Sequence, residues 1–273
     1  MPIAKAVASG YNPSMRRWAL VLIPILLVLV LGMAVSDRSR DHSLDLVRQR
    51  GTLRVGMDAS FPPFEVVNAV GELEGLDVDL ARLLAREMDL NLDIANIAFD
   101  GLYEALSCGE VDLLLSALPY DPLRTGDVRY SAPYFTDGLQ WLYRVDSWAA
   151  DPDAFEGEVL AEAGSEAARL ARQNWPRARV TEVLSEQDVV LQLTEGAEAG
   201  IVTRVSACSF GLPHDGIAFG PLISEVPYSV VARAGDTAVA EAVADALDEV
   251  MASDDYRAAV VYWLGEGCWR EPR

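Results

Sequence analysis

The stretch LRVGMDASFPPFE, residues 53–65, holds the first strand of the fold and the segment that leaves it. The apolar run Thr52–Met57 predicts this strand, and a turn leads from it to a helix over about 78–88. The apolar residues of the helix recur on one stripe, and Asp77 is a candidate N-cap. Three further predicted elements follow: a strand over 91–97, a short helix over 100–108 and a strand over 111–115. Because strands and helices alternate, the sequence predicts an α/β sheet with helices on both faces.

A second α/β unit follows the apolar stretch 139–145. Its predicted elements are a strand over 159–163, a helix over 165–173, a strand over 179–183, a helix over 186–193, and strands over 199–202, 217–219 and 228–233. Two helices then close the chain, over 239–251 and 254–264, and the first of them has apolar residues at i, i+3, i+4 and i+7. A length of 273 residues accommodates both units.

Three segments carry a family resemblance. The first is the stretch 53–65, and the second is Gly75-Leu-Asp-Val-Asp-Leu-Ala81. The third runs through these four pieces: Ala98-Phe-Asp-Gly-Leu102, Gly109-Glu-Val-Asp112, Asp121-Pro-Leu-Arg124 and Tyr130-Ser-Ala-Pro-Tyr-Phe135. In this order and spacing they resemble the bacterial extracellular solute-binding proteins of family 3, the periplasmic amino-acid receptors of ABC importers. The resemblance covers about residues 45–265.

The resemblance implies a two-lobed, periplasmic-binding-protein-like (type II) clamp with two hinge crossovers. Its expected parts are residues 51–138 as the first part of lobe 1, 139–227 as lobe 2, and 228–273 as the C-terminal part of lobe 1. The crossovers are expected near 139–141 and 226–228. Ligand would lie in the cleft, where closure of the lobes buries it.

Six candidate ligand-binding residues belong to lobe 1: Asp58, Phe61, Phe99, Ala117, Pro119 and Arg124. Arg124 follows a predicted strand after a short turn, where open α/β sheets bind ligands, and its guanidinium suits a bidentate grip on a carboxylate. The family uses an arginine there for the ligand's α-carboxylate; the alternative is a surface ion pair with Asp127. Phe61 and Phe99 match positions that sandwich the ligand side chain, or they are ordinary core residues. Asp58 matches a position that contacts the ligand's polar end, or it forms a turn.

Lobe 2 supplies two candidate ligand-binding residues, Ser165 and Thr203. Ser165 offers a hydroxyl and a backbone N–H to a carboxylate, and it also suits a helix N-cap.

The sequence departs from the family pattern at two places. In the first, Ala117 replaces the family's usual Gly, and Pro119 replaces Thr or Ser, so that one expected contact is missing. Thr203 stands where the family has an acid for the ligand's α-amino group, and the neighbouring Arg204 would oppose an ammonium. Whether the ligand carries an ammonium stays open, with Asp58 or Glu166 as other sources of negative charge.

The N-terminus predicts export. Basic residues precede the apolar run 18–35, and residues 1–36 contain no acidic side chain. Eighteen residues span about 27 Å as a helix, close to the hydrocarbon thickness of a bilayer. Residues 1–36 are therefore either a signal peptide cleaved near Ala34-Val-Ser36 or a signal anchor that crosses the membrane through 18–35. Residues 37–50 follow as a juxtamembrane linker, and the rest of the chain is expected at the periplasmic or extracellular face, anchored or secreted.

Composition narrows the function further. The chain has 22 Lys and Arg against 42 Asp and Glu, a formal charge of −20, so nucleic acid is not an expected partner. With only two histidines, no catalytic relay, metal site or cofactor is expected. Three cysteines in an oxidising compartment allow at most one disulfide, whose pairing stays open.

The leading hypothesis is a non-enzymatic substrate-binding protein of an ABC importer. It would capture an amino acid or related small carboxylate and deliver it to the permease subunits. One alternative is a membrane-anchored sensing domain that signals to a partner. The other is a prephenate-type dehydratase, for which Glu162 and Glu166 are nominal cleft acids.

Overall fold

The computed structural model describes residues 41–213 and 216–268, almost all of which belong to the compact unit Ser43–Arg273. The predicted signal segment, including the apolar run 18–35, lies outside the described residues. Among the helices that are described, none has the length and apolar character needed to cross a membrane.

The first sheet has five strands in the order β5-β1-β6-β13-β7. Their bounds are β1 Thr52–Met57, β5 Asn91–Asn96, β6 Leu113–Leu114, β7 Val128–Asp137 and β13 Val226–Arg233. β5, β1 and β6 run parallel, whereas β13 is antiparallel to both of its neighbours. The sheet therefore joins two parts of the chain that are far apart in the sequence.

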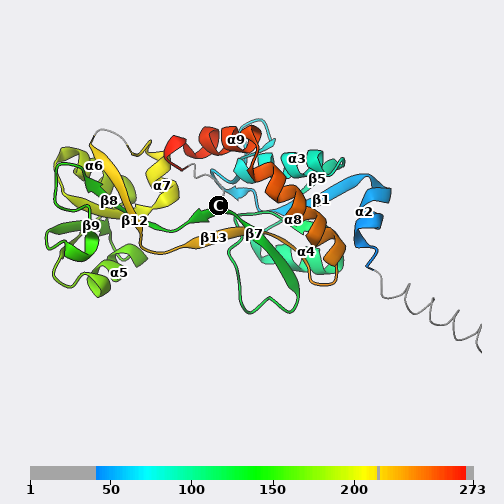
Figure 1. Ribbon diagram of the computed structural model, residues 1–273, viewed down its shortest axis with the longest axis horizontal. Helices are drawn as coiled ribbons and strands as arrows, with labels where there is room; N and C mark the ends of the chain where they lie inside the picture. The colour runs from blue at the N-terminus through cyan, green and yellow to red at the C-terminus, as the bar shows by residue number, and fades with distance from the viewer. Residues whose placement is uncertain (1–40, 214–215, 269–273) are drawn as a thin grey trace, which may run out of the picture. The chain divides into compact units, whose positions relative to one another are not determined.

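Helices cover both faces of this sheet, as the sequence predicts. They are α2 Ser43–Arg50, α3 Leu76–Glu87, α4 Leu102–Cys108, α8 Thr237–Met251 and α9 Asp254–Leu264. Leu113 of β6 packs in one apolar cluster with residues of α3, α8 and α9, whereas the next residue, Leu114, packs in another with residues of α4. Because successive side chains of a strand point to opposite faces, the two clusters lie on opposite sides of the sheet. Figure 1 shows α3, α4 and α8 grouped with these strands.

The start of α3 corrects one prediction. Its N-cap is Gly75, which adopts φ 135°, and a Cβ there would lie 2.0 Å from the Phe64 carbonyl oxygen. Only glycine fits such an approach. Asp77 is therefore not the N-cap: it lies in the first turn, fully buried, and accepts a hydrogen bond from the Ala117 N–H at 2.7 Å. A small sheet of β2 Ser60–Phe61, β3 Glu65–Val67 and β4 Leu73–Glu74 connects β1 to α3.

The second sheet has the order β10-β9-β11-β8-β12. Its strands are β8 Leu139–Arg144, β9 Glu158–Glu162, β10 Arg179–Val183, β11 Ala199–Thr203 and β12 Ile217–Leu222, and its helices are α5 Glu166–Asn174, α6 Glu186–Glu195 and α7 Arg204–Ser209. β9 runs parallel to β10 and β11, and β8 is antiparallel to β11 and β12. One face packs on α5 around the fully buried Trp141, and the other packs on α6 and α7.

Two chain crossings and one disulfide connect the sheets. The chain passes from β7 to β8 through Gly138, and it returns from β12 to β13. Cys208 of α7 is bonded to Cys268 of the short 3-10 helix η3 Glu266–Cys268, within the expected limit of one disulfide, and this gives the pairing that the sequence left open. Cys108 is a free, exposed thiol. Cys268 falls in the segment expected in lobe 1, yet its covalent partner lies beside the second sheet.

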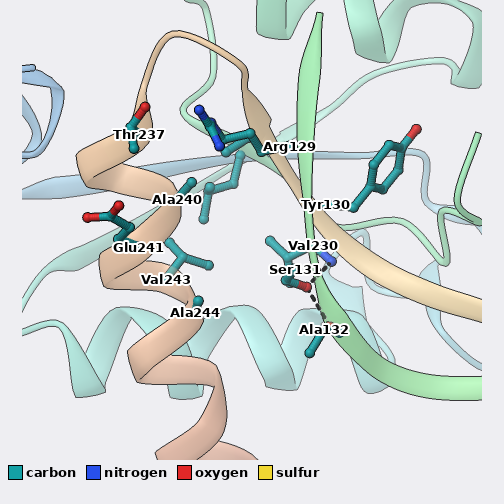
Figure 2. Close-up of a pocket in the computed structure, with 12 residues that line it drawn as sticks. Arg129, Tyr130, Ser131, Ala132, Val230, Thr237, Ala240, Glu241, Val243 and Ala244 are labelled. Atoms are coloured by element: carbon teal, nitrogen blue, oxygen red, sulfur yellow. Dashed lines mark hydrogen bonds between the residues drawn. The ribbon is translucent and has the colours of Figure 1, made fainter. Parts of the chain in front are cut away.

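A cavity of about 220 Å³ lies between α8 and strands β7 and β13 (Figure 2). Its charged lining residues are Arg129 and Glu241, and most of the others are apolar. None of the predicted site residues lines it.

Candidate ligand-binding site

Asp58 connects three segments at the carboxyl end of the first sheet. It follows β1, and its backbone N–H donates to Ser116 Oγ at 3.0 Å. Its Oδ2 accepts from the Phe99 N–H at 2.9 Å, at the start of the 3-10 helix η1 Phe99–Gly101. Asp58, Phe99 and the Ser116–Ala117 segment are therefore brought together at the strand ends where α/β sheets bind ligands.

The two candidate phenylalanines are not core residues. The side chain of Phe61 is 48% exposed and that of Phe99 is 52% exposed. Phe61 stacks on the buried Phe64, with the ring centroids 5.7 Å apart and the rings 10° from parallel. Each residue thus keeps exposed apolar surface, as a ligand-contacting ring requires.

Ala117 and Pro119 lie on the segment after β6. Ala117 adopts φ 42°, a left-handed conformation that is uncommon for a residue with a Cβ. Its N–H is committed to Asp77. Pro119 is exposed and forms an isolated antiparallel bridge with Tyr228 of β13, which holds the segment against the sheet.

Arg124 lies beside α4. Its guanidinium carbon is 3.9 Å from the ring centroid of Tyr103, and its Nε is 3.5 Å from Asp121 Oδ2. The ion-pair partner is thus Asp121 rather than the Asp127 that the sequence suggested. The arginine side chain is 45% exposed, and it lines a cavity of about 580 Å³ between α4 and the loop before β7. Among the described residues, no hydrogen bond or ion pair joins Arg124 to Asp58 or Phe99.

Ser165 is the N-cap of α5. Its Oγ accepts from the Ala168 N–H at 3.2 Å and donates to the Glu162 carbonyl at 2.7 Å. Its backbone N–H donates to the same carbonyl. Because both Ser165 donors are occupied, the hydrogen bonds support the capping role.

Thr203 ends β11 and caps α7, and an acid that the sequence did not single out stands beside it. Glu186, the first residue of α6, accepts from the Thr203 N–H at 2.7 Å and from Thr203 Oγ1 at 3.0 Å. Glu186 and Thr203 are 17 positions apart. The signal in the sequence that could have identified Glu186 is its place after strand β10, since Thr203 stands at the end of strand β11. A carboxylate thus occupies the neighbourhood in which the sequence appeared to lack one.

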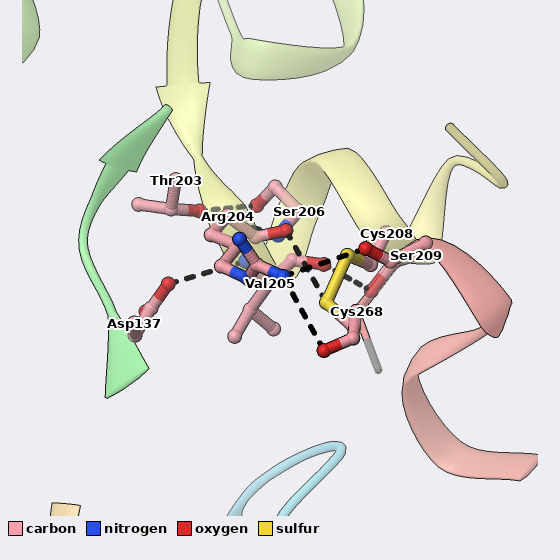
Figure 3. The surroundings of a disulfide bond; sticks show 9 residues. Asp137, Thr203, Arg204, Val205, Ser206, Cys208, Ser209 and Cys268 are labelled. Atoms are coloured by element: carbon pink, nitrogen blue, oxygen red, sulfur yellow. Dashed lines mark hydrogen bonds between the residues drawn. A yellow bond between two sulfur atoms is a disulfide. The ribbon is translucent and has the colours of Figure 1, made fainter. Parts of the chain in front are cut away.

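The Arg204 guanidinium is directed to the C-terminal segment (Figure 3). The residue is buried, and its Nη2 donates to the carbonyls of Gly267 at 3.4 Å and Cys268 at 3.3 Å. On the opposite side of this helix start, Asp137 Oδ1 accepts from the Val205 N–H at 3.2 Å. Burial raises the pKa of Asp137, and the charge of Glu186 raises it further. The Arg204 guanidinium is thus hydrogen bonded on the η3 side of the helix start.

Comparison with known proteins defines the class. The family model of the bacterial extracellular solute-binding proteins, family 3, matches residues 53–266, and the chain belongs to this family. The L-arginine-binding protein of Pseudomonas aeruginosa is 28% identical over 219 residues, covering 75% of this chain and 85% of that protein.

Two solved structures show the fold. The unliganded, open L-cystine solute receptor of Neisseria gonorrhoeae has a TM-score of 0.73 at 17% identity, covering 85% of this chain and 99% of the receptor. An ancestral cyclohexadienyl dehydratase has a TM-score of 0.66 at 24% identity, covering 81% of this chain and 95% of that chain. The chain has the two-lobed periplasmic-binding-protein fold.

Proposed function

We propose that this protein is the extracytoplasmic substrate-binding component of an ABC importer and that it captures an amino acid or a related small carboxylate by lobe closure. Family membership over residues 53–266 and the similarity to an L-arginine-binding protein support this class of function. Residues 51–138 and 228–273, which include the strands of the first sheet, form lobe 1, and residues 139–227 form lobe 2. The importer's permease subunits are the partner that receives the ligand.

The observation that carries the proposal is the placement of Arg124 on Tyr103. Tyr103 lies four residues after the half-exposed Phe99, along the continuous run of η1 and α4. The guanidinium over Tyr103 therefore lies along the same helical run that begins with the exposed Phe99. A ligand that rests on Phe99 and Phe61 can place its carboxylate toward Arg124, whose exposed Asp121 partner is a weak competitor.

Glu186 of lobe 2 completes the charge pattern. A ligand trapped between closed lobes is desolvated, so each of its charged groups needs a partner. The carboxylate of Glu186 stands at Thr203, and the guanidinium of Arg204 is held on the other side by the C-terminal carbonyls. An ammonium-bearing ligand therefore finds a negative charge in lobe 2 and a positive charge in lobe 1.

A dehydratase is the weaker alternative. The fold is shared with an ancestral cyclohexadienyl dehydratase, so the scaffold itself is compatible with such chemistry. Of the two nominal acids, however, Glu166 is paired with Arg169 at the surface, and this hydrogen-bonded pair lowers its pKa. A general acid needs a raised pKa, and a lowered one disfavours the role. Absence of prephenate turnover above the uncatalysed rate is the expected result.

Cleavage or retention of residues 1–36 decides whether the protein is released or stays anchored in the membrane. The apolar run 18–35 either anchors the clamp at the outer face of the membrane or is removed at Ala34-Val-Ser36. N-terminal sequencing of the exported protein separates the two. A retained N-terminus would also keep open the role of an anchored sensor.

The binding proposal is tested with Arg124→Ala. A panel of amino acids and organic acids is screened by thermal shift, because a ligand that binds the native state raises the melting temperature. The best ligand is then measured by calorimetry on the wild type, on Arg124→Ala and on the control Arg82→Ala, which removes a similar exposed arginine paired with Asp79. We expect Arg124→Ala to cost about 2–5 kcal/mol of binding free energy and the control to cost nothing measurable. An Arg124→Ala affinity within twofold of wild type contradicts the carboxylate role.

A further inference from the structure

Two buried carboxylates lie behind the candidate site. Glu65 of β3 and Asp77 of α3 are both 0% exposed. Within the described part of the chain, neither is in an ion pair with an arginine. Isolated buried charges are costly, so two neighbouring buried carboxylates cannot both remain ionised without a compensating group.

Each carboxylate has one oxygen with partners and one without. Glu65 Oε1 accepts from Ser116 Oγ at 2.7 Å, while Asp77 Oδ2 accepts from the Ala117 N–H at 2.7 Å and from the Tyr134 hydroxyl at 2.8 Å. Glu65 Oε2 and Asp77 Oδ1 are buried and have no donor. A single proton on Glu65 that is donated to Asp77 would satisfy both orphaned oxygens at once.

The electrostatics favour this arrangement. Burial, reinforced by the charge of Asp77, raises the pKa of Glu65 to about 10. Burial also raises the pKa of Asp77, to about 6, although hydrogen bonds from Ala117, Tyr134 and Glu65 offset part of the effect. Of the two groups, Glu65 has the more strongly raised pKa and is therefore the one that would carry a proton, whereas Asp77 would accept it on Oδ1.

We propose that Glu65 and Asp77 share one proton and act as positioning residues that hold the ends of β1 and β6 in the geometry the ligand site requires. This inference rests on the proposed function. The pair acts through Ser116 and the Ala117 N–H.

The hydrogen bonds connect the pair to the site in two steps. Ser116 Oγ donates to Glu65 and accepts from the Asp58 N–H, so that it ties the end of β1 to the pair. Asp77 holds the N–H of Ala117 in its left-handed conformation. Such a conformation persists where its surroundings determine it, and the hydrogen bond to Asp77 is one contact that does so here.

The other titratable groups around the pair are few. Tyr134 of β7, Tyr228 of β13 and Tyr256 of α9 face it, and burial raises the pKa of each phenol. The charge of Asp58, after β1, also acts on Glu65. The phenols stay protonated at neutral pH. The proton shared by Glu65 and Asp77 is therefore the one whose loss changes the charge of this region.

The test combines an infrared and a binding measurement on the full exported protein. A protonated carboxyl group has its own C=O stretching band, which we expect at pH 8 in the wild type and in the exposed control Glu87→Gln. The band is expected to vanish in Glu65→Gln, whose amide replaces the protonated acid. In Ser116→Ala the band is expected to shift, because Glu65 loses the donor on its other oxygen.

Affinity for the best ligand of the amino-acid panel then tests positioning. We expect Glu65→Gln to bind within threefold of wild type, since its amide donates where the proton did. Ser116→Ala should bind about tenfold more weakly, because the connection to Asp58 is lost. Absence of the band from wild type at pH 8, or unchanged affinity of Ser116→Ala, overturns the inference while ligand binding stands. If the band behaves as expected but the protein binds no amino acid or organic acid, the proposed function is overturned instead.

Discussion

Removal of the Cys208–Cys268 disulfide tests how much the covalent link between α7 and η3 stabilises the fold. The bond joins α7, which packs on the second sheet, to η3, which directly follows α9 of the first lobe. It therefore adds a covalent connection between the lobes to the crossings from β7 to β8 and from β12 to β13. Figure 3 shows the bond beside Arg204, whose guanidinium holds the carbonyl of Cys268. The perturbation is the double replacement Cys208→Ala and Cys268→Ala.

The expected magnitude follows from the loop that the bond closes. Its cysteines are 60 residues apart in the sequence. In the chain-entropy model, closing a loop of this size removes about 14 cal/mol/K from the unfolded ensemble, or about 4 kcal/mol at 25 °C. We expect the double variant to lose about that much free energy of unfolding, because the native contacts of Arg204 remain in place.

The assay is urea unfolding, followed by circular dichroism, with and without a reductant. Wild type should lose about 4 kcal/mol on reduction, whereas the double variant should not respond. Cys108→Ala removes the free thiol and should behave as wild type under both conditions. A double variant within 1 kcal/mol of oxidised wild type would refute the reasoning, because the bond would then constrain nothing that the fold does not already fix.

Three further predictions concern titration, specificity and packing. Because the folded-state pKa of Glu65 is raised to about 10, the native state keeps a proton that the unfolded chain releases, and the free energy of unfolding should fall by about 1.4 kcal/mol per pH unit from pH 7 to 9. Glu65→Gln should remove this slope in pH-dependent urea unfolding, and an unchanged slope counts against the shared proton. Glu186→Gln should weaken binding of an amino acid by about 1.5–3 kcal/mol in calorimetry but leave its deaminated analogue unaffected, with Glu195→Gln as the exposed control; equal losses for both ligands would contradict an ammonium contact. Trp141→Ala should destabilise lobe 2 by about 3–5 kcal/mol in urea unfolding, since the fully buried ring packs on Phe155 and Trp175, and a loss below 1 kcal/mol would contradict that.

The regular elements of the fold could be predicted from local patterns. Strand β1 and helices α8 and α9 match their expected ranges closely, because their apolar spacing reflects the face that each one buries. Helix α7 has no such signal. Its six residues are held by one local contact, the Thr203 cap, and by two tertiary contacts, which are the hydrogen bond to Asp137 from the first sheet and the disulfide. β6 is shorter than the predicted strand 111–115, since only two of its residues pair as a strand on both sides.

The site could be predicted in part. The family resemblance assigned both Asp58 and Phe99 to the ligand, and the structure joins the two residues by a hydrogen bond. It could not assign Asp77, because an acid at a helix start is normally an exposed cap, and only the folded chain shows the buried Ala117 N–H that recruits it. The capture of Arg204 by the C-terminal carbonyls is likewise a contact across 64 positions, which no local pattern contains.

Glu186 shows that the acid for a ligand's ammonium need not stand at the position where the family pattern has it. β10 and β11 both flank β9 in parallel, so their carboxyl ends lie at one edge of the sheet, and Ser165 follows β9 between them. The side chain of Glu186 starts beyond β10 and reaches Thr203 at the end of β11, so its carboxylate spans that edge. A binding site is complementary to its ligand in space, so a charge can come from whichever strand end reaches the same point. Thr203 therefore does not exclude an ammonium-bearing ligand: its hydroxyl orients the acid that would meet one, and replacing Thr203 by Val should weaken amino-acid binding through Glu186.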